Sequence, residues 1–413
     1  MRSLLFIVAR SLRQHLLSTV ITVVSAGLAS GLVMSVFTVS EQSRTAFTGG
    51  DIGYDAVLGA KGSQLQLVLN TVFHLETSPG NIPWSLYQEV KGRGDVRYAI
   101  PYALGDNLYG YRIVGTTREI FEVFEFQNGQ KFRFQGDGQP FDEGYQEAVL
   151  GSVVAEKLGL KRGDTFRPYH GLQYMPGSAP HQELYRITGV LEPTNTANDG
   201  VIWIPIEGIF RMDGHKLAGG TEEVERGAAI PDEWKEVSAV MLKYSSPIRG
   251  KFMQDEIRRG DSATLAWPIA SVLGTFFLKI GWITKVLLYV AYLVVVVAGF
   301  GLLASIYNTM NERRREFAIL RALGARKGTV FSAIVLEASS IALLGSLVGY
   351  LVYGGILFGS AMIIREQTGV VLDVTSVHPS LLWTPLGMVA VGALAGVIPA
   401  IKAYSTDVAR TLA

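Results

Sequence analysis

The stretch "NERRREFAILRALGARKGTVF", residues 311–331, separates two long apolar runs and decides how the chain crosses a membrane. It contains six basic residues and only two acidic ones. Loops rich in Lys and Arg stay on the cytoplasmic side of a membrane. The segment 311–330 is therefore predicted to be a cytoplasmic connection. The segment 365–380, whose only Lys or Arg is Arg365, is predicted to lie on the opposite side.

Four segments are apolar enough to cross a membrane, since a transmembrane helix needs roughly 20 mostly apolar residues. They are residues 16–40, 266–310, 331–364 and 381–401. The first follows an arm, residues 1–15, that carries three arginines and no acidic residue, which is also typical of a signal peptide. Its apolar part continues well beyond the roughly 7–15 residues of a signal peptide. We therefore predict an uncleaved anchor, with the arm and the tail, residues 402–413, in the cytoplasm.

Residues 41–265 are predicted to form a large folded domain outside the cytoplasm. Short β-branched and aromatic runs recur there between turn residues, as in "YRIVGTT" (111–117) and "GVIWIPIEGIF" (200–210). "QEAVLGSVVAEKLGL" (146–160) changes from a strand pattern to a helix pattern at Ser152. The predicted fold class is a membrane α-helical protein with four transmembrane helices and an inserted extracytoplasmic α+β domain between helices 1 and 2.

The segment 266–310 contains no proline after Pro268 and no run of turn residues, so one continuous helix is expected. About 43 residues of helix reach roughly 65 Å. The hydrocarbon core of a bilayer is only about 30 Å thick. We therefore predict a stalk that continues from the second transmembrane helix into the outer domain. The alternative is a break at Gly281 that separates a surface helix from a membrane span.

Composition and motifs exclude several classes of protein. The 413 residues include no cysteine, which excludes disulfides and thiol chemistry. The formal net charge of +1 argues against a protein that binds nucleic acid. No G-x-x-x-x-G-K-[ST], G-x-S-x-G or H-E-x-x-H motif occurs. We predict a chain without catalytic residues and without a cofactor of its own.

Three histidines lie in polar loops of the outer domain: His170, His181 and His215. Imidazole groups are common metal ligands, but the spacing of these three matches no recognised metal motif. We therefore expect solvated loop side chains and predict no metal site.

Three pairs of glycines have the G-x-x-x-G spacing that lets helix backbones approach closely. They are Gly27 and Gly31, Gly345 and Gly349, and Gly392 and Gly396. Packing inside one four-helix bundle is the preferred interpretation, and a homodimer interface is the alternative. Glu337 lies within an apolar segment, where a carboxylate needs a partner. A structural role, bonded to serines or to an arginine near the cytoplasmic face, is favoured over a role in transport or proton relay.

The basic connection resembles that of the FtsX-like ABC transporter permeases, the group that contains the macrolide-exporter and lipoprotein-releasing systems. The matching positions are Glu312, Arg313, Arg315, Glu316, Ile319, Leu320, Arg321, Ala322, Leu323, Gly324 and Ala325. The end of the chain matches the closing segment of the group at Pro399, Ala400, Ala403, Asp407 and Val408. "VLGSVVAEKLGLKRGDTF" (149–166) and "YRITGVLEPTNTANDG" (185–200) resemble its periplasmic core domain. The inserts 168–183 and 211–235 match no pattern that indicates a substrate.

The resemblance implies that the connection docks into a partner ATPase. The expected ATPase-coupling residues are Arg313, Arg315, Glu316, Phe317, Leu320, Arg321, Leu323 and Gly324. Phe317, Leu320 and Leu323 have the helical spacing of an apolar stripe that binds in a groove. Gly324 is expected to end this helix and turn the chain back toward the membrane.

The resemblance further implies a permease subunit of an ABC transporter in a bacterial inner membrane, with both termini cytoplasmic and the large domain periplasmic. Since only a short arm precedes the first span, we expect a separate cytoplasmic P-loop ATPase dimer that binds ATP and Mg²⁺. The expected cargo is a lipoprotein, a lipid-like compound or a small molecule. The expected partners are a second permease copy or a related chain, a periplasmic accessory or carrier protein, and membrane lipid. The alternative is a mechanotransmitting module that activates a periplasmic partner, such as a cell-wall hydrolase, without moving cargo.

Overall fold

The chain divides into two compact units in a computed structural model. The structure describes residues 2–48, 52–126, 129–144, 146–212, 215, 217, 229–260, 262–373 and 376–404. The unit that we call the helical unit comprises Met1–Ser43, Ile280–Met362 and Asp373–Ala413. The unit that we call the sheet unit comprises Arg44–Lys279 and Ile363–Leu372.

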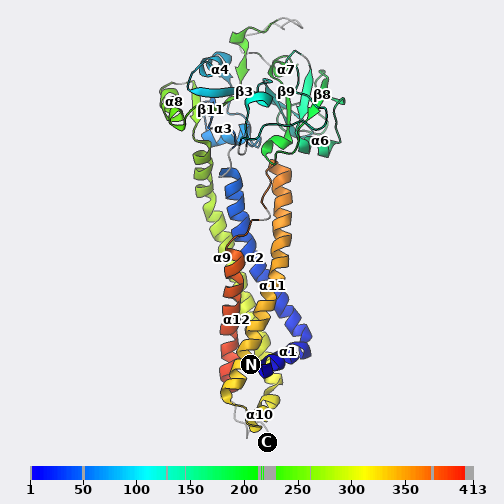
Figure 1. Cartoon of the computed structure of the whole chain (residues 1–413), viewed down its shortest axis with the longest axis vertical. Coiled ribbons are helices and arrows are strands. Elements are labelled where there is room, and N and C mark those ends of the chain that lie inside the picture. The colour runs from blue at the N-terminus through cyan, green and yellow to red at the C-terminus, as the bar shows by residue number, and fades with distance from the viewer. Residues whose placement is uncertain are drawn as a thin grey trace. The chain divides into compact units, whose positions relative to one another are not determined.

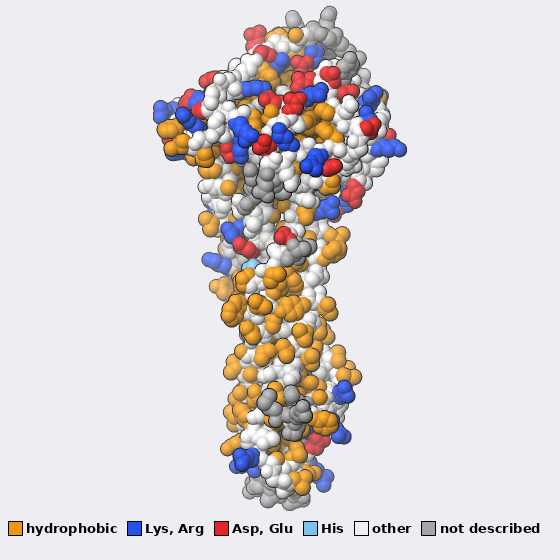
Figure 2. Space-filling view, viewed as in Figure 1, with side chains coloured by type: hydrophobic (Ala, Val, Ile, Leu, Met, Phe, Trp, Pro, Cys, Tyr) orange, Lys and Arg blue, Asp and Glu red, His pale blue; other side chains and the backbone are white. Residues whose placement is uncertain are grey.

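Four long apolar helices confirm the predicted number of transmembrane helices. They are α2 (Leu16–Thr48), α9 (Ile269–Glu312), α11 (Lys327–Thr368) and α12 (Ser380–Tyr404), with mean hydropathy between 2.0 and 2.6 (Figure 1). Hydrophobic side chains gather on the visible face of the helical unit, and Lys and Arg lie at the end that carries α10 (Figure 2). The described residues of this unit also form the shorter helices α1 (Arg2–Gln14) and α10 (Arg314–Ala322).

Helix α9 is unbroken over 44 residues and passes through Gly281 without interruption. The prediction of one continuous helix is therefore confirmed, and the alternative of a break at Gly281 is wrong. At 1.5 Å per residue the helix is about 66 Å long. Helices α2 and α11 are also longer than predicted, because they continue to Thr48 and Thr368. Three of the four transmembrane helices thus extend from the helical unit into residues of the sheet unit.

The sheet unit contains a ten-stranded sheet with the order β12-β1-β11-β3-β4-β9-β5-β8-β6, in which β7 pairs with β3. Most neighbours are antiparallel, but β4–β9 and β5–β8 are parallel. The strands are β1 (Ala56–Ala60), β3 (Val96–Leu108), β4 (Tyr111–Thr116), β5 (Glu147–Leu150), β6 (Thr165–Phe166), β7 (Tyr169–His170), β8 (Tyr185–Val190), β9 (Val201–Pro205), β11 (Ala239–Tyr244) and β12 (Ala263–Ala266). A separate pair joins β2 (Ile82–Pro83) to β10 (Glu236–Val237). The mixed α+β prediction is confirmed, including the change from strand to helix at Ser152.

Both faces of this sheet are buried. Alternate residues of a strand point to opposite faces, so neighbouring residues belong to different cores. Leu58 belongs to one core cluster and Val57 to the other, and neither side chain is exposed. The first face packs against α4 (Trp84–Lys91), α6 (Ser152–Leu158), α7 (Ile206–Phe210) and α8 (Pro247–Arg259). The second face packs against α3 (Gln64–Thr71) and α5 (Ile120–Val123). Single 3-10 turns lie at Ala197–Gly200 and Asp232–Trp234.

The ends of the three extended transmembrane helices also pack on the second face. Ile269 and Leu273 at the start of α9 are buried in that cluster, and Phe47 near the end of α2 is packed against it. Ile364 of α11 contacts the same cluster, and Val370, just after α11, is buried in it. These helix ends are therefore part of the core of the sheet unit.

The G-x-x-x-G pairs pack helices together inside the helical unit. A Cβ added at Gly31 of α2 would lie 2.8 Å from the carbonyl oxygen of Gly349 in α11. A Cβ added at Gly392 of α12 would lie 2.6 Å from the Cβ of Ala342. At Gly396 the added Cβ would lie 2.8 Å from the Cβ of Ala338. These close approaches lie within the helical unit, in agreement with the preferred interpretation of packing inside one bundle.

Gly31→Ala is expected to lower the unfolding temperature of the chain. The added methyl group meets backbone across the helix contact, and overpacking of this kind costs about 1–3 kcal/mol. Gly354→Ala in α11 is the matched control, since a Cβ there meets no atom within 4 Å. Thermal unfolding in detergent, followed by tryptophan fluorescence, measures both variants. Equal unfolding temperatures for the two variants would contradict the close α2–α11 contact.

Candidate functional site

The connection between α9 and α11 folds into the short helix α10, which ends as predicted at Gly324. The φ of Gly324 is +101°, a left-handed conformation that glycine adopts without strain. The N–H of Ala325 donates to the carbonyl of Leu320 at 3.0 Å, and that of Gly324 donates to Arg321 at 3.1 Å. This pair of hydrogen bonds is the Schellman motif that terminates helices. It fixes the direction in which the chain leaves α10 toward α11.

The two faces of α10 have different surroundings. Phe317 and Ala318 are buried. Leu320 packs against the hydrophobic cluster of the helical unit that includes Phe317. Ile319 and Leu323 are 45% and 81% exposed. Spacing of four residues places Arg315, Ile319 and Leu323 on one side of the helix, and all three are exposed. We call these three residues the outward stripe.

This arrangement corrects the predicted docking stripe. Phe317 is only 8% exposed, because its ring packs in the helical unit and lies under the guanidinium of Arg313, 5.1 Å from the ring centroid. Arg313 is 7% exposed and is likewise turned toward the bundle. Arg315, Glu316, Leu323 and Gly324 are exposed, whereas Leu320 and Arg321 are half-buried. Docking by the exposed residues stays a prediction. Of the matched closing segment, Asp407 and Val408 lie outside the described residues.

A buried polar network ties α10 to two other helices. The guanidinium of Arg313 donates through Nη1 to Oγ of Ser11 at 2.5 Å, and Ser11 donates to Oε1 of Glu337 at 2.5 Å. Nη1 of Arg313 also lies 3.6 Å from Oε2 of Glu337. A second carboxylate, that of Glu316, accepts from Nε of Arg313 at 3.0 Å. Glu337 thus has the serine and arginine partners that its predicted structural role requires.

Glu337→Ala is expected to destabilise the helical unit strongly. Removing one partner of a buried ion pair leaves the other charge uncompensated, which typically costs about 3–5 kcal/mol. Arg313→Met alone should also destabilise, whereas the double variant should lose less than the sum of the two single losses. Thermal unfolding of the three variants measures this coupling. Strict additivity would show that Arg313 and Glu337 do not interact.

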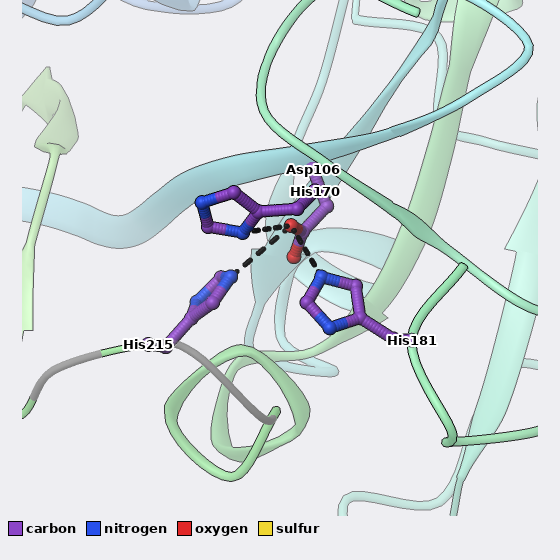
Figure 3. Close-up of side chains that lie close together, drawn as sticks. All are labelled: Asp106, His170, His181 and His215. Carbon is purple, nitrogen blue, oxygen red and sulfur yellow. Dashed lines mark hydrogen bonds and ion pairs between the residues drawn. The ribbon is translucent and has the colours of Figure 1, made fainter. Parts of the chain in front are cut away.

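The three predicted histidines lie together around one buried carboxylate. Nε2 of His181 lies 3.2 Å from Oδ1 of Asp106, Nε2 of His215 lies 3.1 Å from it, and Nδ1 of His170 lies 3.6 Å from it. The three imidazole rings converge on Asp106 (Figure 3). Oδ1 and the three nitrogens all lie within 4.8 Å of one another. The expectation of solvated loop histidines is wrong for His181 and His215, which are 6% and 13% exposed, whereas His170 is 64% exposed.

Strand β3 and its partners position these four residues. β3 changes register between Leu104 and Asp106, where it pairs with β4, and Asp106 stands opposite His170 of β7. The N–H of His181 donates to Pro168 at 2.8 Å, which holds the second histidine next to the first. A Cβ added at Gly105 would lie 2.9 Å from Cε1 of His215. A glycine at this position therefore leaves room for the third ring.

Asp106 was not among the predicted site residues, and its environment is unusual for a carboxylate. Its side chain is completely buried, and Oδ2 has no hydrogen-bond partner among the described residues. Burial raises the pKa of Asp106, but hydrogen bonds and charge from His181 and His215 outweigh it, so the pKa lies below its usual value. The carboxylate is therefore ionised at neutral pH. One signal in the sequence indicated a histidine site: the inserts 168–183 and 211–235 together hold three of the six histidines.

Comparison with known protein families matches most of the chain. The model of the MacB-like periplasmic core domain matches residues 19–259. The model of the FtsX-like permease C-terminal domain matches residues 288–408. These two matches follow one another along the chain, and together they include both units.

Several curated proteins are similar in sequence. The macrolide export ATP-binding/permease protein MacB of Shewanella oneidensis is 23% identical over 329 residues, which are 76% of this chain and 45% of that protein. The MacB of Azoarcus is 28% identical over 239 residues, 55% of this chain and 33% of that protein. An uncharacterized ABC transporter permease of Methanocaldococcus jannaschii is 25% identical over 167 residues, 40% of this chain and 39% of that protein. The chain spans less than half the length of these relatives.

The solved structures that match include the periplasmic region of MacB from Actinobacillus actinomycetemcomitans. The TM-score is 0.33 and the sequence identity is 12%. The match covers 54% of this chain and 93% of that one.

Proposed function

Since this chain belongs to the family defined by a MacB-like periplasmic core domain and an FtsX-like permease C-terminal domain, we propose that it is the permease subunit of an ABC transporter driven by a separate cytoplasmic ATPase. Its 413 residues contain no nucleotide-binding P-loop motif, so in this proposal ATP and Mg²⁺ bind to the partner. The observation that carries the proposal is the outward stripe on α10, which lies between two long continuous helices.

The outward stripe has the properties of a docking surface for another protein. Ile319 and Leu323 expose apolar side chains one helical turn apart, and such anchors bind in a hydrophobic groove. Arg315 adds a positive charge on the same side, which favours an acidic rim on the partner. The Schellman turn and the Arg313–Glu337 network hold α10 in one orientation. Little conformational entropy is therefore lost when the partner binds.

Helices α9 and α11 provide the means of transmission. Each is continuous from the neighbourhood of α10 to the second face of the sheet. A displacement imposed on α10 by closing ATPase subunits would reach Ile269 and Ile364 without passing through a flexible loop. The sheet unit would then change its position on the far side of the membrane, and no continuous aqueous pore is required.

The proposal also places the parts in the cell. The basic segment 311–330 and the N-terminal arm face the cytoplasm, and the sheet unit is periplasmic, in a bacterial inner membrane. The cargo belongs to the classes predicted above, and a periplasmic carrier is an expected partner. Two copies of the permease would bind the ATPase dimer. The exposed apolar residues of α9, such as Tyr289 and Phe300, suit a second copy as well as lipid.

Leu323→Asp is expected to abolish the binding of an ATPase to the chain. Leu323 is 81% exposed, so a charge there should spoil an apolar anchor without disturbing the helical unit. The tagged chain is purified from native membranes in mild detergent, and bound proteins are identified by mass spectrometry. A P-loop ATPase should accompany the wild type and be lost from Leu323→Asp. Its ATP hydrolysis should respond to the wild-type permease only.

Leu323→Met is the matched control, since it keeps an apolar side chain of similar size and should retain the ATPase. Ile319→Asp should repeat the loss, because Ile319 lies one turn away on the same side. If no ATPase accompanies the wild type, or if both aspartate variants retain it, α10 is not the docking site and the proposal fails.

A further inference from the structure

Asp106, His170, His181 and His215 bring three imidazole nitrogens and one carboxylate oxygen to one point of the sheet unit. We propose that these four residues bind one divalent transition-metal ion, with zinc as the best fit, and that the ion fastens His170, His181 and His215 to Asp106 of strand β3. This site is separate from the coupling segment, and the proposal does not depend on the transport function.

A hydrogen-bond network alone accounts poorly for the arrangement. Three imidazole nitrogens point at the same oxygen, Oδ1 of Asp106, at 3.1, 3.2 and 3.6 Å. A carboxylate oxygen has two lone pairs, which the hydrogen bonds with His181 and His215 fill, so Nδ1 of His170 at 3.6 Å has no hydrogen bond to it. The second oxygen, Oδ2, is buried and has no hydrogen-bond partner among the described residues. Convergence of donors on one atom, beside an unsatisfied atom of the same group, is the arrangement expected around a cation.

The distances suit a tetrahedral ion. Zinc binds imidazole nitrogen and carboxylate oxygen at roughly 2.0–2.2 Å, so two ligands of one tetrahedral zinc lie roughly 3.3–3.6 Å apart. The separations from Oδ1 of Asp106 to the three nitrogens are close to that range. A modest movement of the side chains would complete the coordination.

The rings are arranged almost symmetrically about the same point. Their centroids are 5.5, 5.2 and 5.6 Å apart, and their planes meet at 75°, 75° and 74°. This near-threefold arrangement favours a tetrahedral ion over the square-planar coordination of Cu²⁺. Three nitrogen ligands also disfavour Mg²⁺ and Ca²⁺, which prefer oxygen.

The surroundings hold the ligands in place and leave access to solvent. The side-chain amide of Asn107 donates to the carbonyl of Gly171 at 2.8 Å, and the N–H of Gly171 donates to Gly105 at 2.8 Å. These contacts fix the turn that carries His170. The side chain of His170 is 64% exposed, whereas His181 and His215 are 6% and 13% exposed. An ion can therefore reach the site from the side of His170.

Four protein ligands leave no open coordination position, which is typical of structural zinc sites. The consequence here is mechanical, because His170 and His181 come from one insert and His215 from the other. Asp106 belongs to the sheet itself and stands opposite Ile113, a residue of the first-face core. A bound ion would join both inserts to the first face of the sheet.

The test uses the full chain, purified in detergent and stripped of metal with a chelator. Zinc chloride is added, and binding is measured by calorimetry and by elemental analysis after desalting. We expect one zinc per chain, no competition from Mg²⁺ or Ca²⁺, and a rise in unfolding temperature with zinc concentration. Cobalt chloride should give the visible absorption of tetrahedral Co²⁺.

His170→Ala is the principal variant, since its exposed side chain can be removed without loss of packing. Zinc affinity should fall by more than the roughly 10–100-fold that loss of an outer-shell partner costs. Asp106→Asn should weaken binding similarly, and His170→Ala alone carries the test if that buried variant does not fold. His378→Ala, in the helical unit, is the control and should bind zinc as the wild type does. If the wild type takes up no zinc, or if His170→Ala binds as tightly as His378→Ala, the four residues form no metal site.

Discussion

The rest of this structure depends on one constraint, an unbroken helix whose length exceeds the thickness of a membrane. Backbone polar groups cannot remain unpaired in lipid, so the apolar part of Ile269–Glu312 must be helical. The absence of proline then allows the helix to continue well past the bilayer. The excess at its start does not end in solvent, because Ile269 and Leu273 are buried in the second-face core of the sheet unit. One helix therefore supplies both a membrane span and part of a folded core.

Contacts within the bundle explain how such long helices are held in register. Helices in lipid gain little from hydrophobic association, so close backbone contact and buried polar groups have to position them. Helix α2 packs against α11 at Gly345 and Gly349, and α12 packs against α11 at Ala338 and Ala342. The same helix carries Glu337, which orients Arg313 at the start of α10. With this ion pair formed, α10 is oriented so that Phe317 faces the bundle and Leu323 faces outward.

The sequence predicts the parts of the fold that depend on local pattern. Apolar length identifies the four membrane helices, period-two runs identify strands such as β4 and β9, and the glycine at 324 marks the end of α10. The rotation of α10 is not predictable in this way, since Phe317 and Leu320 on one side and Ile319 and Leu323 on the other are equally apolar. A buried contact with a distant helix decides between them. Asp106 is hidden for a related reason. It is one acidic residue in a long strand, and only the pairing of β3 with β7 brings it to the histidines.

The buried helix ends and the proposed metal site lie on opposite faces of the same sheet. The ends of α2, α9 and α11 pack on the second face, whereas Asp106 stands next to Ile113 on the first. In the proposed mechanism, force transmitted along the helices would enter the second-face core. An ion bound by the histidines would instead hold His170, His181 and His215 to Asp106 on the first face. Because the sheet lies between the ion and the buried helix ends, the ion could bind without altering the contacts of those ends. The proposed coupling to an ATPase and the proposed binding of a metal ion would thus be separable, because each depends on its own residues.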